Sequence, residues 1–253
     1  MIDTHCHLAE PHYEGELTNI VNNFSTAGID FVVTIGYDEK NNLASRDIAH
    51  DYDNVYYTVG YHPDECASYD EMKLESMLMR NDKKLVALGE IGLDYFHNKE
   101  NKDKQKEVFI HQINLAKKYN LPIVIHCRDA YGDMLEILKE NMPFTNGAVM
   151  HCYSGSLEFA KEIIKLGIKI SFTGSVTFKN ARNLHEVAKN IPLDSFFFET
   201  DSPYMTPEPY RGRRNEPKNV FLVAEHVANL REMNVNELVQ ITDKNARGFY
   251  GIE

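Results

Sequence analysis

Short, nearly continuous apolar runs recur along the whole chain and are the clearest pattern in it. Residues 31–35, 55–60 and 85–91 are rich in Val, Ile, Leu and Tyr, and the first two runs are closed by glycine. Runs of this length between turn residues are typical of strands that are buried on both faces. The pattern predicts eight such strands, at residues 2–8, 31–35, 55–60, 85–91, 122–127, 147–152, 168–172 and 196–200.

The segments between these runs have the periodicity of helices. Leu17, Ile20 and Phe24, for example, recur at helical spacing before a glycine at position 28. The predicted helices cover residues 13–27, 41–50, 69–80, 101–119, 130–140, 157–166, 181–189, 217–230 and 235–250.

Alternation of buried strands with helices predicts a parallel sheet that is covered by helices on its outside. Eight repeats over 253 residues favour closure of this sheet. The expected fold class is therefore α/β, a (β/α)₈ TIM-like barrel that forms a single domain over residues 1–253. An open doubly wound sheet is the alternative, but no glycine-rich phosphate loop follows the first predicted strand.

Composition restricts the setting of this barrel. Hydrophobic residues make up 43% of the chain, and no apolar run approaches the roughly 18 residues that a membrane span needs. The N-terminus lacks the pattern of a signal peptide, so we expect a cytoplasmic protein without membrane association. The net charge of −11 argues against sequence-independent adhesion to nucleic-acid backbones, which requires a basic surface.

Residue types that bind metal ions stand at the carboxyl ends of the predicted strands. In the first strand, the period of two sends His5 and His7 to the same face. The carboxyl ends of all barrel strands meet at one mouth, where the active sites of such barrels lie. The metal ligands that we expect there are His5, His7, Glu90, His126, His151 and Asp201.

Four imidazoles and two carboxylates exceed the needs of one tetrahedral ion but suit two divalent ions roughly 3.5–4 Å apart. Glu90, central among the strands, is the expected bridge between them, and Asp201 is the expected acceptor of a proton from the nucleophile. Zn, Mn and Co suit the mixed ligands, and Mg less obviously. Such a site would generate a metal-bound hydroxide, and its floor would carry a charge of about +2 that attracts phosphate.

Three cysteines flank the predicted ligands. Cys6, Cys127 and Cys152 each lie one residue from a predicted histidine ligand. On a strand, each would point the opposite way, toward the helix layer. We therefore expect buried thiols that bind no metal.

The densest cluster of cationic residues follows the eighth strand. Arg211, Arg213 and Arg214 could hold phosphates in a bidentate manner, and so could Arg128 after the fifth strand. Ion pairing with neighbouring carboxylates such as Glu216 would equally explain these arginines as loop scaffolding.

Three further residues are candidate substrate contacts. Tyr153 and Tyr204 could stack on nucleic-acid bases, although packing is the commoner role of tyrosine on barrel loops. His62 follows the third strand and could contact the substrate or support a ligand.

The motifs that carry these residues resemble, nearly end to end, those of the TatD-type metal-dependent deoxyribonucleases of the amidohydrolase-like barrel superfamily. The motifs are Asp3-Thr4-His5-Cys6-His7-Leu8, Gly89-Glu90-Ile91-Gly92-Leu93-Asp94-Tyr95, Pro122-Ile123-Val124-Ile125-His126-Cys127-Arg128-Asp129-Ala130, His151-Cys152-Tyr153-Ser154-Gly155, Ile170-Ser171-Phe172-Thr173-Gly174, Glu199-Thr200-Asp201-Ser202-Pro203-Tyr204 and Arg211-Gly212-Arg213-Arg214-Asn215-Glu216-Pro217. The resemblance implies a TIM-like barrel, divalent metals held by the six ligands above, and hydrolysis of DNA, often from 3′ to 5′. Ala9, where an acidic residue is common, is a minor departure.

The expected function is thus that of a 3′-5′ exodeoxyribonuclease whose substrate is DNA, as single strands or 3′ ends. The same chemistry would also serve a carboxylic ester or amide hydrolase, for instance one acting on aminoacyl-tRNA. A non-catalytic binding protein on a decayed barrel is a third possibility, which the complete ligand set disfavours. The sequence makes no prediction of oligomeric state.

Overall fold

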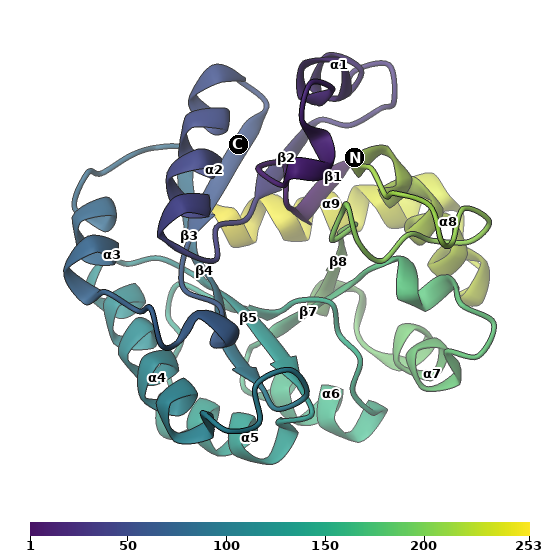
Figure 1. Cartoon of the computed structure of the whole chain (residues 1–253). Coiled ribbons are helices and arrows are strands. Elements are labelled where there is room, and N and C mark those ends of the chain that lie inside the picture. Colours follow the sequence, from purple (N-terminus) through teal and green to yellow (C-terminus); the bar gives the residue numbers. More distant parts are fainter.

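The computed structural model describes residues 1–253 as one barrel of eight strands surrounded by helices (Figure 1). The strands are β1 (Ile2–Cys6), β2 (Phe31–Thr34), β3 (Val55–Val59), β4 (Leu85–Asp94), β5 (Ile123–Arg128), β6 (Ala148–Met150), β7 (Lys169–Phe172) and β8 (Phe196–Phe198). The helices are α1 (Leu17–Asn22), α2 (Glu39–Asp51), α3 (Glu71–Leu78), α4 (Lys102–Lys118), α5 (Tyr131–Glu140), α6 (Leu157–Lys165), α7 (Arg182–Asn190), α8 (Val220–Leu230) and α9 (Val235–Tyr250). Short 3₁₀ helices are η1 (Pro11–Tyr13), η2 (Pro63–Glu65), η3 (Gly174–Thr177), η4 (Leu193–Ser195) and η5 (Pro217–Asn219).

The strands lie in sequence order, and all seven neighbouring pairs are parallel. The last strand returns to the first through the segment that follows it. The amide of His7 donates to the carbonyl of Ser202 at 2.8 Å, and the amide of Asp201 donates to the carbonyl of His5 at 2.8 Å. These bonds close the barrel and confirm the predicted single-domain (β/α)₈ fold.

Two apolar cores hold the barrel together. The larger core lies between the outer faces of the strands and the helices and contains 51 buried residues. The smaller core joins inward-facing strand residues such as Val33, Val124 and Phe197 to Phe249 and Tyr250 of α9. Figure 1 shows α9 (yellow) crossing behind the strands, so this helix closes the end of the barrel away from the mouth. None of the helices combines the length and the apolar composition that a membrane span requires.

Most elements match the prediction to within a few residues at each end, and two differ more. Helix α1 has only six residues instead of the predicted 13–27, because η1 and turns occupy the flanking residues. The ring of Tyr13 is buried, and its hydroxyl donates to the carbonyl of Asn215 at 2.8 Å, so this residue anchors a loop instead of starting the helix. Strand β4 continues to Asp94, three residues beyond the predicted end, and this extension brings a further carboxylate to the mouth.

Candidate active site

Glu90 stands at the centre of the mouth because strand β4 is irregular at this point. Leu88 pairs with Ile123 and Ile91 pairs with Ile125, so three residues of β4 advance past two of β5. An extra residue of this kind re-aims a side chain out of the regular alternation. The carboxylate of Glu90 is 4% exposed and reaches histidines from four other strands.

One oxygen of this carboxylate faces the predicted ligands at the ends of strands β1 and β8. Glu90 Oε2 lies 3.4 Å from His5 Nε2 and 3.9 Å from His7 Nε2. Asp201 Oδ1 lies 3.5 Å from His5 Nε2 and 3.3 Å from His7 Nε2. The two imidazole nitrogens are themselves 3.3 Å apart. Each imidazole nitrogen thus lies 3.3–3.9 Å from the other three donor atoms.

The other oxygen faces the predicted ligands at the ends of strands β5 and β6. Glu90 Oε1 lies 2.6 Å from His151 Nε2 and 2.8 Å from His126 Nδ1, and these two nitrogens are 3.3 Å apart. The six predicted ligands are therefore gathered in two groups, with one oxygen of Glu90 in each.

These spacings fit cations. Ligand bonds of about 2.1 Å in a tetrahedron separate neighbouring ligand atoms by about 3.4 Å, which matches the first group. His5 Nδ1 and His7 Nδ1 are buried without a hydrogen-bond partner. Only the Nε2 atoms of these two rings converge on the other donor atoms. Crowded nitrogen and carboxylate atoms repel one another unless protons or cations lie between them. The donor set therefore suits divalent ions.

Burial and mutual charge perturb the ligands in opposite directions. Burial lowers the pKa of His5, and the charge of His151 adds to this effect. Burial would also lower the pKa of His151, but the carboxylates of Glu90 and Glu199 outweigh it and raise that pKa well above its ordinary value. For Glu90, burial favours protonation, but the neighbouring histidines prevail and hold its pKa well below the usual range. The carboxylate is ionised at neutral pH.

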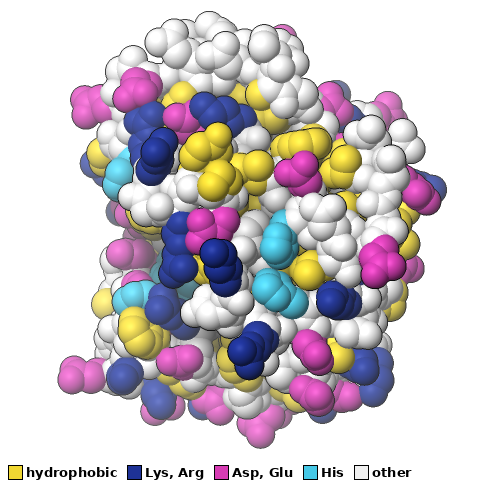
Figure 2. All heavy atoms as spheres, turned by 90° about the vertical axis from the view of Figure 1, so that its right-hand side faces the viewer, with side chains coloured by type: hydrophobic (Ala, Val, Ile, Leu, Met, Phe, Trp, Pro, Cys, Tyr) yellow, Lys and Arg dark blue, Asp and Glu magenta, His cyan; other side chains and the backbone are white.

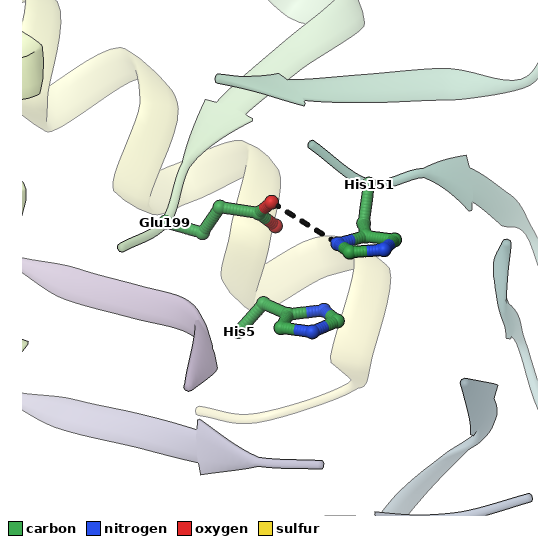
Figure 3. Close-up of side chains that lie close together, drawn as sticks. All are labelled: His5, His151 and Glu199. Carbon is green, nitrogen blue, oxygen red and sulfur yellow. Dashed lines mark ion pairs between the residues drawn. The ribbon is translucent and has the colours of Figure 1, made fainter. Parts of the chain in front are cut away.

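Glu199 supports the site from behind and was missed in the sequence analysis. Its Oε1 lies 3.4 Å from His151 Nδ1 and accepts the amide of Cys152 at 2.7 Å, while its Oε2 accepts the hydroxyl of Ser171 at 2.6 Å. Figure 3 shows its carboxylate pointing at the ring of His151, which stacks on His5 at 4.0 Å. Its position two residues before Asp201, within the motif Glu199-Thr200-Asp201, is the signal in the sequence that points to it.

Asp94, at the end of β4, plays a comparable part for His126. Its Oδ2 lies 3.1 Å from His126 Nε2 and 2.9 Å from His97 Nδ1, and its Oδ1 accepts the amides of Phe96 and His97 at 2.8 Å. A carboxylate on the second nitrogen of a ligating histidine fixes the orientation and tautomer of the ring.

The predicted substrate contact His62 lies over Glu90, with its Nε2 3.7 Å from Glu90 Oε1. The amide of Asp64 donates to His62 Nδ1 at 3.2 Å, so Nε2 carries the proton of the neutral ring. Burial lowers the pKa of His62 to about 3, and the charge of His126 contributes. At neutral pH, His62 thus presents a neutral N–H donor at the mouth.

Several strands end sharply at this mouth. Asp129, Cys152 and Asp201 follow strands β5, β6 and β8 and have φ angles of +53°, +44° and +54°. These are left-handed conformations that residues other than glycine rarely adopt. The turn at Asp201 lets its amide bond to strand β1 while its carboxylate points to the two histidines of that strand.

A cavity of about 820 Å³ opens above the ligands. Besides the ligands, its walls carry four further carboxylates and a single cationic side chain, that of Arg128. The charge of +2 expected from the sequence included only the two ions and the two ligand carboxylates. With all six carboxylates of the lining and one arginine, two divalent ions would leave the cavity close to neutral. The additional carboxylates belong to Glu10, Asp64, Glu65 and Asp94.

The other predicted substrate contacts divide between the cavity and its surroundings. Tyr204 and His62 line the cavity together with Arg128. Tyr153 does not, because its ring is buried and its hydroxyl donates to the carbonyl of Ser156 at 2.6 Å, which is the packing role that the sequence left open.

The three loop arginines lie outside the cavity. Arg214 is held as scaffolding by Glu16 at 2.8 Å and Glu216 at 3.2 Å. Arg211 stacks on Phe178 at 4.0 Å, and Arg213 lines a separate groove. Figure 2 shows the face that carries α7 and α8, where Lys and Arg side chains are interspersed with hydrophobic ones.

The cysteines follow the prediction only in part. Cys6 is fully buried, and its Sγ lies 3.5 Å from the carbonyl of Val33. Cys127 packs against the larger core, as expected, although it also borders the cavity. Cys152 lines the cavity, and its Sγ lies 3.5 Å from the hydroxyl oxygen of Thr173, so the expected orientation toward the helices is wrong for this residue. For Cys152 the reason is that β6 ends at Met150, and the alternation of a strand no longer applies beyond it.

Comparison with known proteins agrees with this geometry. A family model described as "TatD related DNase" matches residues 2–251. The "uncharacterized metal-dependent hydrolase" YabD of Bacillus subtilis (strain 168) is 42% identical over 253 residues, which cover 100% of this chain and 99% of YabD. YcfH of Escherichia coli (strain K12), which bears the same description, is 37% identical, with 100% of this chain and 96% of YcfH covered. The crystal structure of YjjV, a TatD homologue from Escherichia coli K12, superimposes with a TM-score of 0.95 at 29% identity and covers 100% of this chain and 98% of YjjV. The chain therefore belongs to the TatD-related DNase family.

Proposed function

We propose that this metal-dependent hydrolase cleaves the phosphodiester bonds of DNA, as a 3′-to-5′ exodeoxyribonuclease that acts on single strands or 3′ ends. The observation that carries the proposal is that the two oxygens of Glu90 face two separate groups of ligand atoms. Two adjacent cation sites of this kind occur in nucleases, polymerases and phosphatases, where they stabilise the attacking and leaving oxygens. The family description supports DNA as the substrate.

The residues proposed to hold two divalent ions, Zn, Mn, Mg or Co, are the six ligands described above. Ions bound there would stabilise charge on the reacting phosphate and acidify a water molecule. The bridging carboxylate of Glu90 would fix the distance between the two sites, and Glu199 and Asp94 would hold the rings of His151 and His126 in place.

Asp201 is the proposed acceptor for the proton of the attacking water. Burial would raise its pKa, but the hydrogen bond and charge from His7 prevail and lower it, so the carboxylate is free to accept a proton at neutral pH. The water oxygen forms a bond to phosphorus, and the bond between phosphorus and the O3′ of the preceding nucleotide breaks in line with it. The N–H of His62 and the guanidinium of Arg128, which both line the cavity, are the proposed contacts for phosphate oxygens.

The charge of the cavity supports action at a strand end. A cavity that is nearly neutral after two ions bind can accept one phosphodiester but offers little attraction to a second. Further phosphates of a long strand would lie outside, where Arg211 and Arg213 carry no ion pair. These arginines are the proposed contacts for the rest of the strand.

One observation favours a second candidate, hydrolysis of an aminoacyl ester. Glu10, Asp64 and Glu65 line the cavity without an ion pair or hydrogen bond to any of the six proposed ligands. Glu10 accepts the hydroxyl of Tyr37, and Asp64 contacts His62. Carboxylates in this position would suit a substrate that carries an ammonium group, as an aminoacyl ester does.

The decisive experiment compares the two substrates on protein reconstituted with each metal. A 3′-labelled single-stranded DNA and an aminoacyl ester are incubated in parallel, with Asp201→Asn as the inactive control. Release of labelled mononucleotide by the wild type alone supports the exonuclease. Turnover of the ester alone would contradict the exonuclease and support the second candidate, the aminoacyl-ester hydrolase. Cleavage of circular single-stranded DNA would contradict action from an end.

A further inference from the structure

Two aromatic side chains are exposed on opposite sides of the mouth. Phe96, just after β4, is 48% exposed, and Tyr204, after β8, is 46% exposed. Strands β4 and β8 are separated by three strands on either side of the barrel, so the two residues follow opposite strands. Tyr204 lines the cavity, and Phe96 lies beside its lining residues His97 and Arg128. Large apolar surfaces are normally covered, and rings left open beside a binding cavity are candidates for contact with a ligand.

The ring of Phe96 contacts the only cationic side chain that lines the cavity, that of Arg128. The guanidinium of Arg128 lies over the ring of Phe96, 4.1 Å from its centroid, and Arg128 makes no ion pair. The neighbouring His97 lines the cavity, packs edge-on against Phe96 at 4.9 Å and is anchored by Asp94. The stacked guanidinium keeps its N–H edges free, so one flat apolar face and one phosphate-binding edge lie side by side.

Tyr204 is presented by a rigid backbone. Its amide donates to the carbonyl of Asp201 at 2.9 Å, and its carbonyl accepts the side chain of Asn215 at 2.7 Å. Its ring lies 6.1 Å from that of the proposed ligand His7. These bonds fix the backbone at Tyr204, and its ring lies next to that of a proposed ligand.

We propose that Phe96 and Tyr204 are stacking platforms for the two bases that flank the cleaved phosphodiester, and that Arg128 binds the phosphate on the side of Phe96. The proposal rests on the proposed function and specifies its substrate as an unstacked dinucleotide unit. Because the cavity is close to neutral with two ions bound, its affinity for DNA depends on the bases more than on phosphate charge. Bases of a duplex are paired and stacked on each other, so only a single strand can open over both rings.

The test is a set of single-stranded trinucleotides in which one base at a time is replaced by an abasic residue. Stacking on one aromatic ring changes binding by about 5- to 150-fold. We expect Phe96→Ala and Tyr204→Ala each to lower kcat/KM on the intact trinucleotide by such a factor. On the substrate that lacks the base facing the deleted ring, each variant should have nearly the same kcat/KM as the wild type. Tyr204→Phe should remain close to wild type. Met79→Ala, which removes a side chain 69% exposed just after α3, controls for loss of surface apolar area.

Equal losses on intact and abasic substrates in both variants would overturn the proposal and make the rings structural. A measurement independent of turnover uses the inactive Asp201→Asn protein and a trinucleotide with 2-aminopurine at the end or next to it. Stacking should quench the fluorescence, and the Phe96→Ala or Tyr204→Ala change should restore it at one position each. Absence of quenching refutes the platforms even if DNA is cleaved. Quenching without cleavage by the wild type would instead refute only the proposed nuclease activity.

Discussion

Replacement of Glu199 by glutamine tests whether the buried carboxylate behind His151 sets the metal affinity of the site. Glutamine preserves the volume and can keep both anchoring bonds. Its oxygen can accept the amide of Cys152, and its amide group can donate to the hydroxyl oxygen of Ser171. The change therefore removes the negative charge 3.4 Å from His151 Nδ1 and leaves the surrounding packing intact.

The magnitude follows from the environment of this pair. Both side chains are almost fully buried, so the charge acts with little screening. Loss of a carboxylate that orients a ligating histidine typically weakens metal binding 10- to 100-fold, or about 1.4–2.7 kcal/mol. Glu199→Ala should do further harm, because the amide of Cys152 and the hydroxyl of Ser171 would lose their partner. Each unpaired buried group costs about 1–3 kcal/mol of folding stability.

The assay is competition for Zn²⁺ or Mn²⁺ against a chromophoric chelator at neutral pH, together with thermal unfolding of the ion-free proteins. Glu10→Gln is the matched control, since it removes one charge from the cavity wall, where the carboxylate accepts the hydroxyl of Tyr37 at 2.7 Å. We expect Glu199→Gln to bind metal at least tenfold more weakly than this control. Equal affinities in the two variants would refute direct orientation of His151 and leave only a long-range effect of charge.

Four further predictions concern the ligands and the arginines. Glu90→Ala should lose bound metal and activity together, and retention of two ions per chain in elemental analysis would remove Glu90 from the bridging role. The raised pKa of His151 means that the ion-free protein is stabilised by a bound proton below about pH 6.5 and loses this stabilisation as pH rises through the folded-state pKa. Metal binding should therefore release protons and tighten with pH in calorimetry with buffers of different ionisation heat, and proton uptake would contradict this. Arg213→Ala should raise KM for long single strands severalfold but not for a dinucleotide, whereas Arg214→Ala should lower thermal stability slightly, by about 0.5–1 kcal/mol, because it breaks the pairs with Glu16 and Glu216. Equal effects of Arg213→Ala on both substrates would make this residue structural.

The periodicity of the sequence was sufficient for the barrel and less so for the ends of its elements. Every predicted strand is present, because buried parallel strands form continuous apolar runs that are hard to mistake. Helix α9 was predicted with its observed bounds, since Gly251 ends it in a left-handed conformation. Helix α1 was predicted too long because apolar spacing alone does not reveal that Tyr13 is needed elsewhere, against the loop at Asn215.

The direct contacts of the site were easier to predict than their supports. All six predicted ligands converge, since histidine and carboxylate at strand ends are rare without a function. Glu199 and Asp94 escaped notice because an acidic residue beside a ligand motif has the same appearance in sequence whether it faces the site or the solvent. The acidic wall of the cavity was hidden for a similar reason. Asp64 and Glu65 come from η2, whose orientation depends on tertiary packing.

The left-handed residues at the strand ends have a consequence for directed evolution of this protein. Residues other than glycine in such conformations are destabilising, by about 1 kcal/mol or more each. Selection for heat resistance alone would therefore favour glycine at Cys152 or Asp201, where the chain turns into the mouth. At Asp201 that gain would delete a proposed ligand. A thermostable variant selected without a screen for turnover is thus expected to carry glycine at such a position and to have lost activity.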